Sequence, residues 1–375
     1  MDFELTDEQV MLRDTVRDLL ARAYDSETRL RVIDTELGWS RDVWKQLAEL
    51  GVLGLPFTEA DGGVGAGPVE AMVVLEEVGR RLAPEPIVDA VYVPGALVAL
   101  AGTEEQRGRV LPELIGGGTL LAFAHAEPGV RWPSTEIDTT ATENAGSYSL
   151  TGTKNPVPHG DAADQLVVSA TLPGGGIGLF LVDPTASGVG RRAYRTVDGL
   201  RGAQIDLDNA PAELLGSAPD ASGHVAAALA GAHALLCAES IGAMAEALRL
   251  TTDYLGTRKQ FGVTLSKFQT LTQRAANMYV SLELARSASL YATAALADGR
   301  VDPVVTSRAR LQVGRAARHV GQEAIQMHGG IGVTAEYPVG HYTARLTAIE
   351  RTLGGGLDHL AVLAAQVGDY ELPEL

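Results

Sequence analysis

Residues 258–262 read Arg258-Lys259-Gln260-Phe261-Gly262, and residues 326–332 read Gln326-Met327-His328-Gly329-Gly330-Ile331-Gly332. Each stretch follows a long segment in which apolar residues repeat at helical spacing. The arginine carries a fork of donors that suits a diphosphate, although a cation paired with the helix dipole would look the same. The adjacent glycines can let a ligand approach the backbone, or they can only cap a helix in the left-handed conformation. Together, the two stretches favour a ligand site at the ends of two helices.

Four long helices are predicted around these stretches, over about 223–257, 265–297, 302–329 and 337–367. The links between them are short, which indicates a helical bundle.

The first part of the chain is also predicted to be helical, and Thr6 and Gln9 match a capping box at its start. Gly116-Gly117-Gly118 marks a boundary, after which apolar residues alternate with a period of two. We expect strands at 120–124, 147–151, 165–170, 177–182, 190–194 and 204–207. The fold class is therefore α+β, with an N-terminal helical domain at 1–117, a middle antiparallel β-barrel or sandwich domain at 118–217, and a C-terminal four-helix bundle at 218–375.

The composition excludes several classes of function. A net charge of −17 repels phosphate backbones, so we expect no nucleic-acid partner. The single cysteine, Cys237, lies in an apolar run and is predicted to be a small core residue, which fits a reducing cytoplasm. The apolar run at 225–238 is too short to span a bilayer, and the acidic start of the chain is unlike a signal peptide. We expect neither a membrane association nor a metal site.

The order and spacing of the quoted stretches, with Phe268-Gln269 between them and Glu336-Tyr337-Pro338 after them, resemble the C-terminal domain of the acyl-CoA dehydrogenases. The order of helices, sheet and helices is that family's order too, so the resemblance covers essentially the whole chain. Members of the family oxidise acyl-CoA thioesters to the 2-enoyl forms with FAD. The resemblance therefore implies an FAD-dependent oxidoreductase, an acyl-CoA substrate and an electron-transfer flavoprotein as the electron acceptor.

The resemblance assigns Arg258, Phe261, Gln326 and Gly330 to FAD, and Gly329 lies beside them in the same stretch. In that family these residues reach across a dimer interface to the neighbour's cofactor. The resemblance therefore implies an oligomer in which each flavin pocket is built from two subunits.

The family's flavin-ring segment corresponds to residues 123–129, where Phe123, His125 and Ala126 are weaker candidates for cofactor contacts. Ala126 stands where the family has a threonine hydroxyl. Pro156 and Pro158 stand where it has an aromatic residue and a threonine, and a proline lacks the N–H as well. We therefore expect the chain's own flavin-ring site to be degraded.

Dehydrogenation requires a carboxylate that removes the α-proton of the substrate. In most of the family that glutamate lies nine residues after the arginine that corresponds to Arg345, which here is Gly354. In a minority it lies on the first bundle helix, which here is Ala232. Both usual positions are therefore empty. The weak candidates for a displaced base are Glu239, Glu350 and His233, with Glu127 a further acid in the flavin-ring segment.

Two main alternatives follow. The chain is either the non-catalytic subunit of a hetero-oligomeric acyl-CoA dehydrogenase, such as the bacterial α2β2 enzymes that act on bulky sterol side-chain esters, or a self-sufficient homo-oligomeric flavoenzyme with a displaced base or different chemistry. A flavin-free scaffold is the third alternative. In the first case, a homologous subunit that carries the glutamate completes the heterotetramer.

Overall fold

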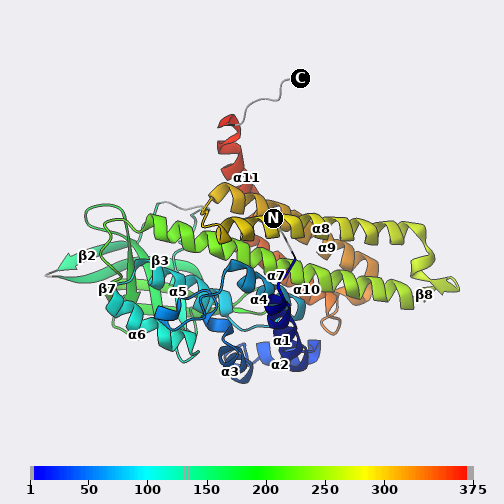
Figure 1. Ribbon diagram of the computed structural model, residues 1–375, viewed down its shortest axis with the longest axis horizontal. Coiled ribbons are helices and arrows are strands. Elements are labelled where there is room, and N and C mark those ends of the chain that lie inside the picture. Colours follow the sequence, from blue (N-terminus) through cyan, green and yellow to red (C-terminus); the bar gives the residue numbers. More distant parts are fainter. Residues whose placement is uncertain (1–3, 131, 133–135, 145, 370–375) are drawn as a thin grey trace. The chain divides into compact units, whose positions relative to one another are not determined.

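The computed structural model of the protein describes residues 4–130, 132, 136–144 and 146–369. The chain divides into two compact units. The first, here the helical unit, holds Met1–Leu30, Met72–Ala83 and His233–Leu375, and the second, here the sheet unit, holds Arg31–Ala71 and Pro84–Ala232. The predicted order of helices, sheet and helices along the chain is confirmed (Figure 1).

The helical unit is built on helices that follow residue 221, although the start of the first of them, up to Ala232, belongs to the sheet unit. They are α7 (Ser222–Thr257), α8 (Gln269–Ala297), α9 (Pro303–His328), α10 (Val339–Arg351) and α11 (Gly356–Ala365). The prediction of one continuous fourth helix over about 337–367 is therefore wrong, because this segment forms two helices, α10 and α11. The break has a backbone cause, since Leu353 and Gly354 both take positive φ angles, of 55° and 98°.

Two helices from the front of the chain join this unit, α1 (Asp7–Ala23) and most of α4 (Pro68–Arg81). The predicted capping box of α1 is confirmed, since the Thr6 hydroxyl accepts from the Gln9 N–H at 3.2 Å and the Gln9 side chain accepts from the Thr6 N–H at 3.0 Å. α4 crosses α7 with the backbones in contact. A Cβ on Gly242 would lie 1.8 Å from the Glu76 carbonyl oxygen, and one on Gly79 would lie 1.9 Å from that of Glu239.

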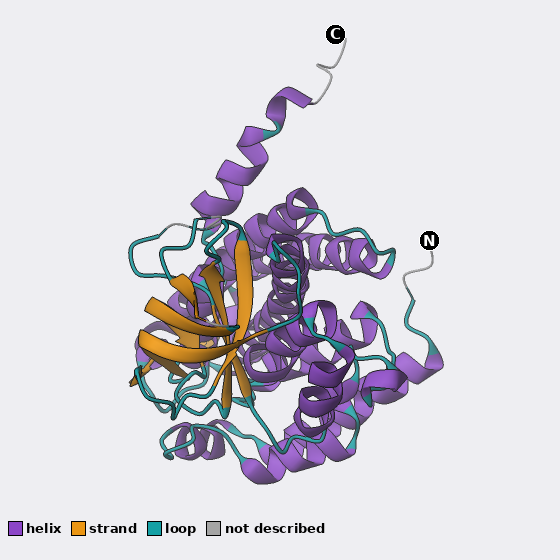
Figure 2. Cartoon of the chain, turned by 90° about the vertical axis from the view of Figure 1, so that its left-hand side faces the viewer, coloured by secondary structure: helices purple, strands orange, loops and turns teal. Residues whose placement is uncertain are grey.

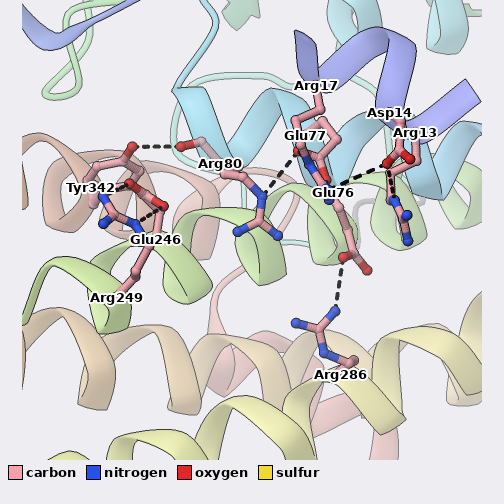
Figure 3. A network of polar contacts seen from close by, with 10 residues as sticks. All are labelled: Arg13, Asp14, Arg17, Glu76, Glu77, Arg80, Glu246, Arg249, Arg286 and Tyr342. Atoms are coloured by element: carbon pink, nitrogen blue, oxygen red, sulfur yellow. Dashed lines mark hydrogen bonds and ion pairs between the residues drawn. The ribbon is translucent and has the colours of Figure 1, made fainter. Parts of the chain in front are cut away.

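Charged pairs fix the same helices to one another (Figure 3). The buried Glu77 of α4 accepts from Arg17 of α1 at 2.7 Å, and Glu76 accepts from Arg286 of α8 at 2.9 Å. The Tyr342 hydroxyl of α10 donates to the Arg80 carbonyl at 2.6 Å. Segments that are far apart in the sequence are thus tied together by interactions that satisfy buried charge.

α7 is the one helix among the described residues that is long and apolar enough to cross a membrane. The apolar run at 225–238 is only its first part, because the helix continues to Thr257. However, 78% of its most apolar window is buried, as for a central helix of a bundle. Cys237 lies in this buried part, and burial raises the pKa of its thiol to about 11, which agrees with the predicted core role.

In the sheet unit, the described residues form one sheet of seven strands (orange in Figure 2). The strands are β1 (Leu121–Ala124), β2 (Thr140–Asn144), β3 (Ser147–Pro158), β4 (Gln165–Thr171), β5 (Ile177–Val182), β6 (Val189–Arg195) and β7 (Arg201–Leu214). β4 pairs with β2 and β5, and β2, β3, β7 and β5 pair in turn, so five strands close a ring around an apolar core. The predicted barrel is confirmed, but the β2–β4 pair within the ring is parallel, and so is the pair that β1 forms with β4 outside it.

Three other helices belong to the sheet unit, α3 (Arg41–Glu49), α5 (Val93–Ala101) and α6 (Glu104–Ile115), and the short α2 (Ser26–Ile33) lies at the division between the units. The Gln106 side chain of α6 donates to the Leu214 carbonyl at 2.8 Å, which anchors this helix to the end of β7.

Candidate functional site

Phe261 lies at the tip of a small hairpin that follows α7. The hairpin pairs β8 (Lys259–Gln260) with β9 (Val263–Thr264), and its two central residues, Phe261 and Gly262, have φ angles of 52° and 82°. These signs fit a type I′ turn, which favours Asn, Asp or Gly at the first central position. Phe261 is instead a bulky aromatic residue, and its side chain is 90% exposed. Phe261 is therefore not a core residue of this chain.

Arg258 lies at the base of this hairpin. Its N–H donates to the Tyr254 carbonyl at 2.8 Å, and its own carbonyl accepts from the Leu265 N–H at 2.9 Å, so the backbone on both sides is held. The Arg258 side chain is exposed, as are those of Lys259 and Lys267 nearby in the chain. An acidic protein thus presents a local group of cations here, which suits a diphosphate.

Gln326, Gly329 and Gly330 lie at the end of α9, and all three are exposed. Gly329 does cap α9, since its N–H donates to the Ile325 and Gln326 carbonyls, but its φ of 66° and ψ of −141° lie outside the left-handed helical region that the capping alternative assumed. This combination is open almost only to glycine. A Cβ on either glycine would meet no atom within 4 Å, so a ligand can approach the bare backbone of both residues.

An aromatic cluster holds the ends of α7 and α9 together. Tyr254 lies one turn before Arg258, and its ring centroid is 4.5 Å from that of His328, the last residue of α9. The Tyr337 ring is 4.8 Å from His328, and its hydroxyl lies 3.2 Å from His328 Nε2. Burial lowers the pKa of His328, which keeps the imidazole neutral inside the cluster. Sequence reasoning missed the positioning role of these residues, although an aromatic residue one turn before the arginine was a usable signal.

The position of the missing base is a buried loop. Gly354 is buried in the left-handed region between α10 and α11. The buried Arg310 of α9 donates to the carbonyls of Ile349 and Thr352, both at 2.7 Å, and so caps the end of α10. Burial lowers the pKa of Arg310, but two carbonyls and the helix dipole still stabilise its charge.

Two histidines complete the surroundings of this loop. His233 Nε2 lies 3.2 Å from the Leu353 carbonyl, and the His233 and His359 rings meet edge to face at 5.0 Å. Burial, followed by the Arg310 charge, lowers the pKa of His359 to about 4 and the pKa of His233 well below its usual value. A neutral His233 donates its Nε2–H to the carbonyl, so this nitrogen is not available as a base.

The two candidate glutamates are also held by other groups. Glu239 is buried in a bidentate pair with Arg345, at 2.6 and 2.9 Å. Glu350 accepts from the Gly356 N–H at 3.1 Å and pairs with Arg351 at 2.8 Å. Ala232 is a buried residue of α7 with no ionisable group. The structure thus places both glutamates in structural ion pairs. It brings His233 and Glu350, but not Glu239, to the loop around Gly354, and Glu350 is already engaged by the Gly356 N–H and by Arg351.

The flavin-ring segment contains a polar cluster of its own in the sheet unit. The fully buried Lys154 donates to Glu127 at 2.7 Å, and the Thr139 hydroxyl donates to Glu127 at 2.6 Å. Burial raises the pKa of Glu127, but these donors outweigh it and bring that pKa to about 2. Burial lowers the pKa of Lys154 to about 8. Glu127 is therefore an ionised structural acid, which makes it a poor general base.

The remaining flavin-ring candidates are packed around this pair. His125 Nδ1 lies 2.9 Å from the Ser169 hydroxyl, and the His125 ring stacks on Phe123 at 5.1 Å. Both side chains are buried, and burial lowers the pKa of His125 to about 4. Ala126 offers only backbone groups, and its carbonyl already accepts from the Asn155 N–H at 2.8 Å. The side chains that the sequence marks as weaker candidates thus serve the packing of this unit.

The two groups of candidate residues fit FAD to different degrees. The exposed cation, the exposed aromatic ring and the two open glycines at the ends of α7 and α9 fit the diphosphate and adenosine half of that cofactor. The flavin-ring segment supplies neither the hydroxyl nor the exposed aromatic ring that the family uses there. The chain therefore fits one half of the cofactor site well and the other half poorly.

Comparison with known proteins yields matches along the whole chain. Three family models match, described as the N-terminal domain (residues 6–118), the middle domain (122–209) and the C-terminal domain (224–361) of acyl-CoA dehydrogenase. The acyl-CoA dehydrogenase FadE28 of Mycobacterium tuberculosis is 31% identical over 98% of this chain and 99% of its own length. A solved variant of the Tcur3481-Tcur3483 steroid ACAD is 32% identical, with a TM-score of 0.88 over 97% of this chain and 98% of that one. The ChsE4-ChsE5 complex of Mycobacterium tuberculosis, 24% identical with a TM-score of 0.91 over 99% of this chain and 100% of that one, shares the fold.

Proposed function

Because the chain belongs to the acyl-CoA dehydrogenase family, whose members are FAD-dependent oxidoreductases, we propose that it is the subunit without a catalytic glutamate in a hetero-oligomeric acyl-CoA dehydrogenase. Its homologous partner supplies the glutamate and seats the flavin ring. This chain completes the partner's cofactor site from outside.

The observation that carries the proposal is the contrast between the two halves of the site. The side chains of Arg258 and Phe261 are exposed, with one edge-to-face contact of Phe261 to Phe268 at 6.1 Å, while Gly354 is enclosed by groups that hydrogen-bond to its loop. A chain that catalysed dehydrogenation at its own site would need an accessible carboxylate at position 354, whereas here that position is a buried glycine.

Each exposed residue has a role in this arrangement. Arg258 would neutralise the cofactor diphosphate, Gln326 would hydrogen-bond it, and the bare backbone at Gly329 and Gly330 would let it lie close. Phe261 would cover an apolar face. When bound, FAD supplies the acceptor for the hydride that leaves the β-carbon of the acyl group, and an electron-transfer flavoprotein would take the electrons onward.

The substrate class we propose is a CoA ester with a bulky acyl group, such as a steroid side-chain intermediate. The 32% identity to a steroid ACAD over nearly the whole chain supports this choice over a short linear acyl group.

The test begins with the chain alone and then with a Glu-bearing homologous subunit co-expressed. Bound flavin per subunit and anaerobic bleaching by steroid and short-chain acyl-CoA esters are measured for both preparations. We expect little flavin and no bleaching from the chain alone, and both from the complex. Near one flavin per chain with bleaching in the first preparation would overturn the proposal in favour of a self-sufficient enzyme, and a flavin-free complex would favour a scaffold.

Arg258→Gln tests the half-site directly in the complex. The lost charge-assisted hydrogen bonds are worth about 2 kcal/mol, or roughly a thirtyfold weaker Kd for FAD. Arg22→Gln, at an exposed arginine in the last turn of α1, is the matched control and should leave the Kd unchanged.

A further inference from the structure

A cavity lies where several helix ends meet inside the helical unit. Its volume is about 180 Å³, and it is lined by the junction of α1 and α2, the end of α4, the second half of α7 and the start of α10. All of its lining residues belong to this one unit, and none of them is a candidate for FAD or for the base. The charged side chains and the histidine that line it are Asp25, Arg29, Arg81, Glu246, Arg249 and His341.

The two acids of this lining are already bound to other groups. Glu246 accepts from Arg249 in a bidentate pair, at 2.9 and 2.6 Å (Figure 3). Arg249 also donates to Asp253 at 2.6 Å, so its charge is neutralised within α7. Asp25 accepts from the Thr28 N–H at 2.7 Å and caps the start of α2. The other two arginines of the cavity are therefore balanced by one carboxylate of the lining at most.

These other two arginines meet the end of α4, but they are used differently. Arg29 is buried, and its Nε donates to the Leu82 carbonyl at 2.7 Å, which caps that helix end. Arg81 is the last residue of α4, and its Nε is buried without a hydrogen-bond partner among the residues that the structure describes. A buried charged donor without a partner is costly and rare, so it points to a bound group. Because Arg29 already caps α4, the helix end does not account for Arg81.

A buried phenol that lines the cavity responds to the same charges. Burial and the Glu246 carboxylate raise the pKa of Tyr342. The charges of Arg81, Arg29 and Arg249 act in the opposite direction and lower it. Three guanidinium groups are thus within electrostatic reach of one hydroxyl of the lining, and such a field attracts an anion.

We propose that this cavity binds a phosphate group, with Arg81 and Arg29 as its main cationic ligands. A guanidinium presents a fork of donors that matches the oxygens of phosphate. α10 begins beside the cavity without a side-chain cap, so its first N–H groups add a partial positive charge. Ser26 also lines the cavity and offers a hydroxyl donor.

The size of the cavity narrows the class of ligand. An apolar cavity of about 150 Å³ already admits benzene. A volume of about 180 Å³ therefore holds a phosphate with a small substituent, but not a dinucleotide. The ligand class is inorganic phosphate or a small phosphate monoester, and the inference does not depend on the half-site proposal.

A bound phosphate would join segments of the helical unit that are far apart in the sequence. Arg29 belongs to α2 and Arg81 to α4, and the same cavity is lined by α7 and α10. A ligand that binds only the folded state stabilises it by mass action. The inferred role is therefore stabilisation of this subunit by a phosphate metabolite.

Isothermal titration calorimetry of the full chain, without flavin or acyl-CoA, tests the site. The probes are inorganic phosphate, glycerol 3-phosphate and glycerol as the uncharged control, at an ionic strength held constant with chloride. We expect a Kd below about 1 mM for at least one of the two phosphates and no binding of glycerol. The phosphate that binds more tightly identifies the source of the group.

Arg81→Gln should weaken that Kd at least tenfold, because it removes a charged donor that no described residue satisfies. Arg22→Gln, at an exposed arginine in the last turn of α1, is the matched control and should leave the Kd unchanged. Without phosphate, Arg81→Gln should shift the thermal unfolding midpoint by less than about 2 °C. If Arg81→Gln folds poorly, Arg81→Lys, which keeps the charge but loses the fork, should still weaken the Kd.

Arg258→Gln distinguishes this cavity from the half-site for the cofactor, and we expect it to leave the phosphate Kd unchanged. The inference fails if Arg258→Gln abolishes phosphate binding and Arg81→Gln does not, because the anion would then lie at the half-site. It also fails if neither phosphate binds below about 10 mM. A lower unfolding midpoint of Arg81→Gln without phosphate, together with an unchanged Kd, would show that Arg81 serves only the fold.

Discussion

The turn at Phe261-Gly262 and the loop at Leu353-Gly354 share an unusual backbone, because in each a non-glycine residue with positive φ precedes a glycine with positive φ. They differ in their surroundings. The loop is enclosed and hydrogen-bonded by Arg310 and His233, so contacts within the chain offset its strain. The turn is held only by the pairing of β8 with β9 and by an edge-to-face contact of Phe261 with Phe268 at 6.1 Å among the described residues, and the Phe261 side chain stays 90% exposed. Strain that a chain does not offset by itself points to a role outside the chain.

The largest expected change in stability comes from restoring the family's glutamate in the enclosed loop. Gly354→Glu forces a charged side chain into a buried left-handed position, so we expect a loss of about 4 kcal/mol in the free energy of unfolding, measured by urea denaturation. The variant alone should still show no bleaching with acyl-CoA. Gly356→Ala is the control, since its Cβ would make only ordinary contacts of 3.5 and 3.7 Å. A stable, active Gly354→Glu chain would show that the loop is open to catalysis.

The next test removes the cation that holds the loop. Arg310→Met leaves the Ile349 and Thr352 carbonyls buried without a donor, so we expect a loss of about 3 kcal/mol. Arg315→Met, on the exposed side of the same helix, should change the stability by less than about 0.5 kcal/mol. Equal effects of the two variants would contradict the assigned role of Arg310.

The histidines beside the enclosed loop make its stability depend on pH. His359 faces His233, Arg310 and Asp358, and its pKa in the folded chain is about 4, against about 6.5 when unfolded. Between these values the unfolded state binds more protons, so stability is lost as the pH falls from about 6.5 to about 4. We expect His359→Gln to remove on the order of 2 kcal/mol of this pH dependence in urea unfolding at a series of pH values. An unchanged slope in the variant would show that His359 is not the group responsible.

The smallest expected change in stability is a gain, at the exposed turn. Phe261→Asn places a residue that tolerates positive φ in the exposed turn, so we expect a gain of about 1 kcal/mol in stability with a weaker Kd for FAD in the complex. Gly262→Ala, one residue later, should instead lose about 1 kcal/mol. Thermal unfolding and flavin retention measure the two quantities, and a loss of stability in Phe261→Asn would mean that the ring is supporting its own chain.

Much of the fold could be predicted from the sequence because its signals are local. Helix spacing, the capping box of α1 and the short apolar runs of β4 and β5 are each signals within one element, and both strands are buried almost throughout. β2 was missed because only Ala141 in this strand is buried, so no alternation is visible. The parallel pairs were missed because strand order depends on partners that are distant in the sequence.

The candidate site divides in the same way. Arg258, Gln326 and the glycines could be found because each lies in a compact motif. The roles of Arg310 and His359 could not be found in this way, because their contacts exist only after folding. Arg310 binds the carbonyls at the end of α10, about forty residues later in the chain, and His359 packs against His233 of α7. The exposure of Phe261 could not be predicted either, since a single aromatic residue in a sequence fits a buried core position and an exposed turn equally well.

The backbone contact between α4 and α7 limits how this chain can be divided. Gly79 and Gly242 leave room for nothing larger than hydrogen where the helices cross, so the two helices form one structural piece although more than a hundred residues separate them. A fragment that begins near residue 218 would lack α4 and would expose the surface of α7 against which α4 packs. In a chimaera of two such subunits, α4 must therefore come from the same parent as the bundle, which makes the unit of exchange discontinuous in the gene.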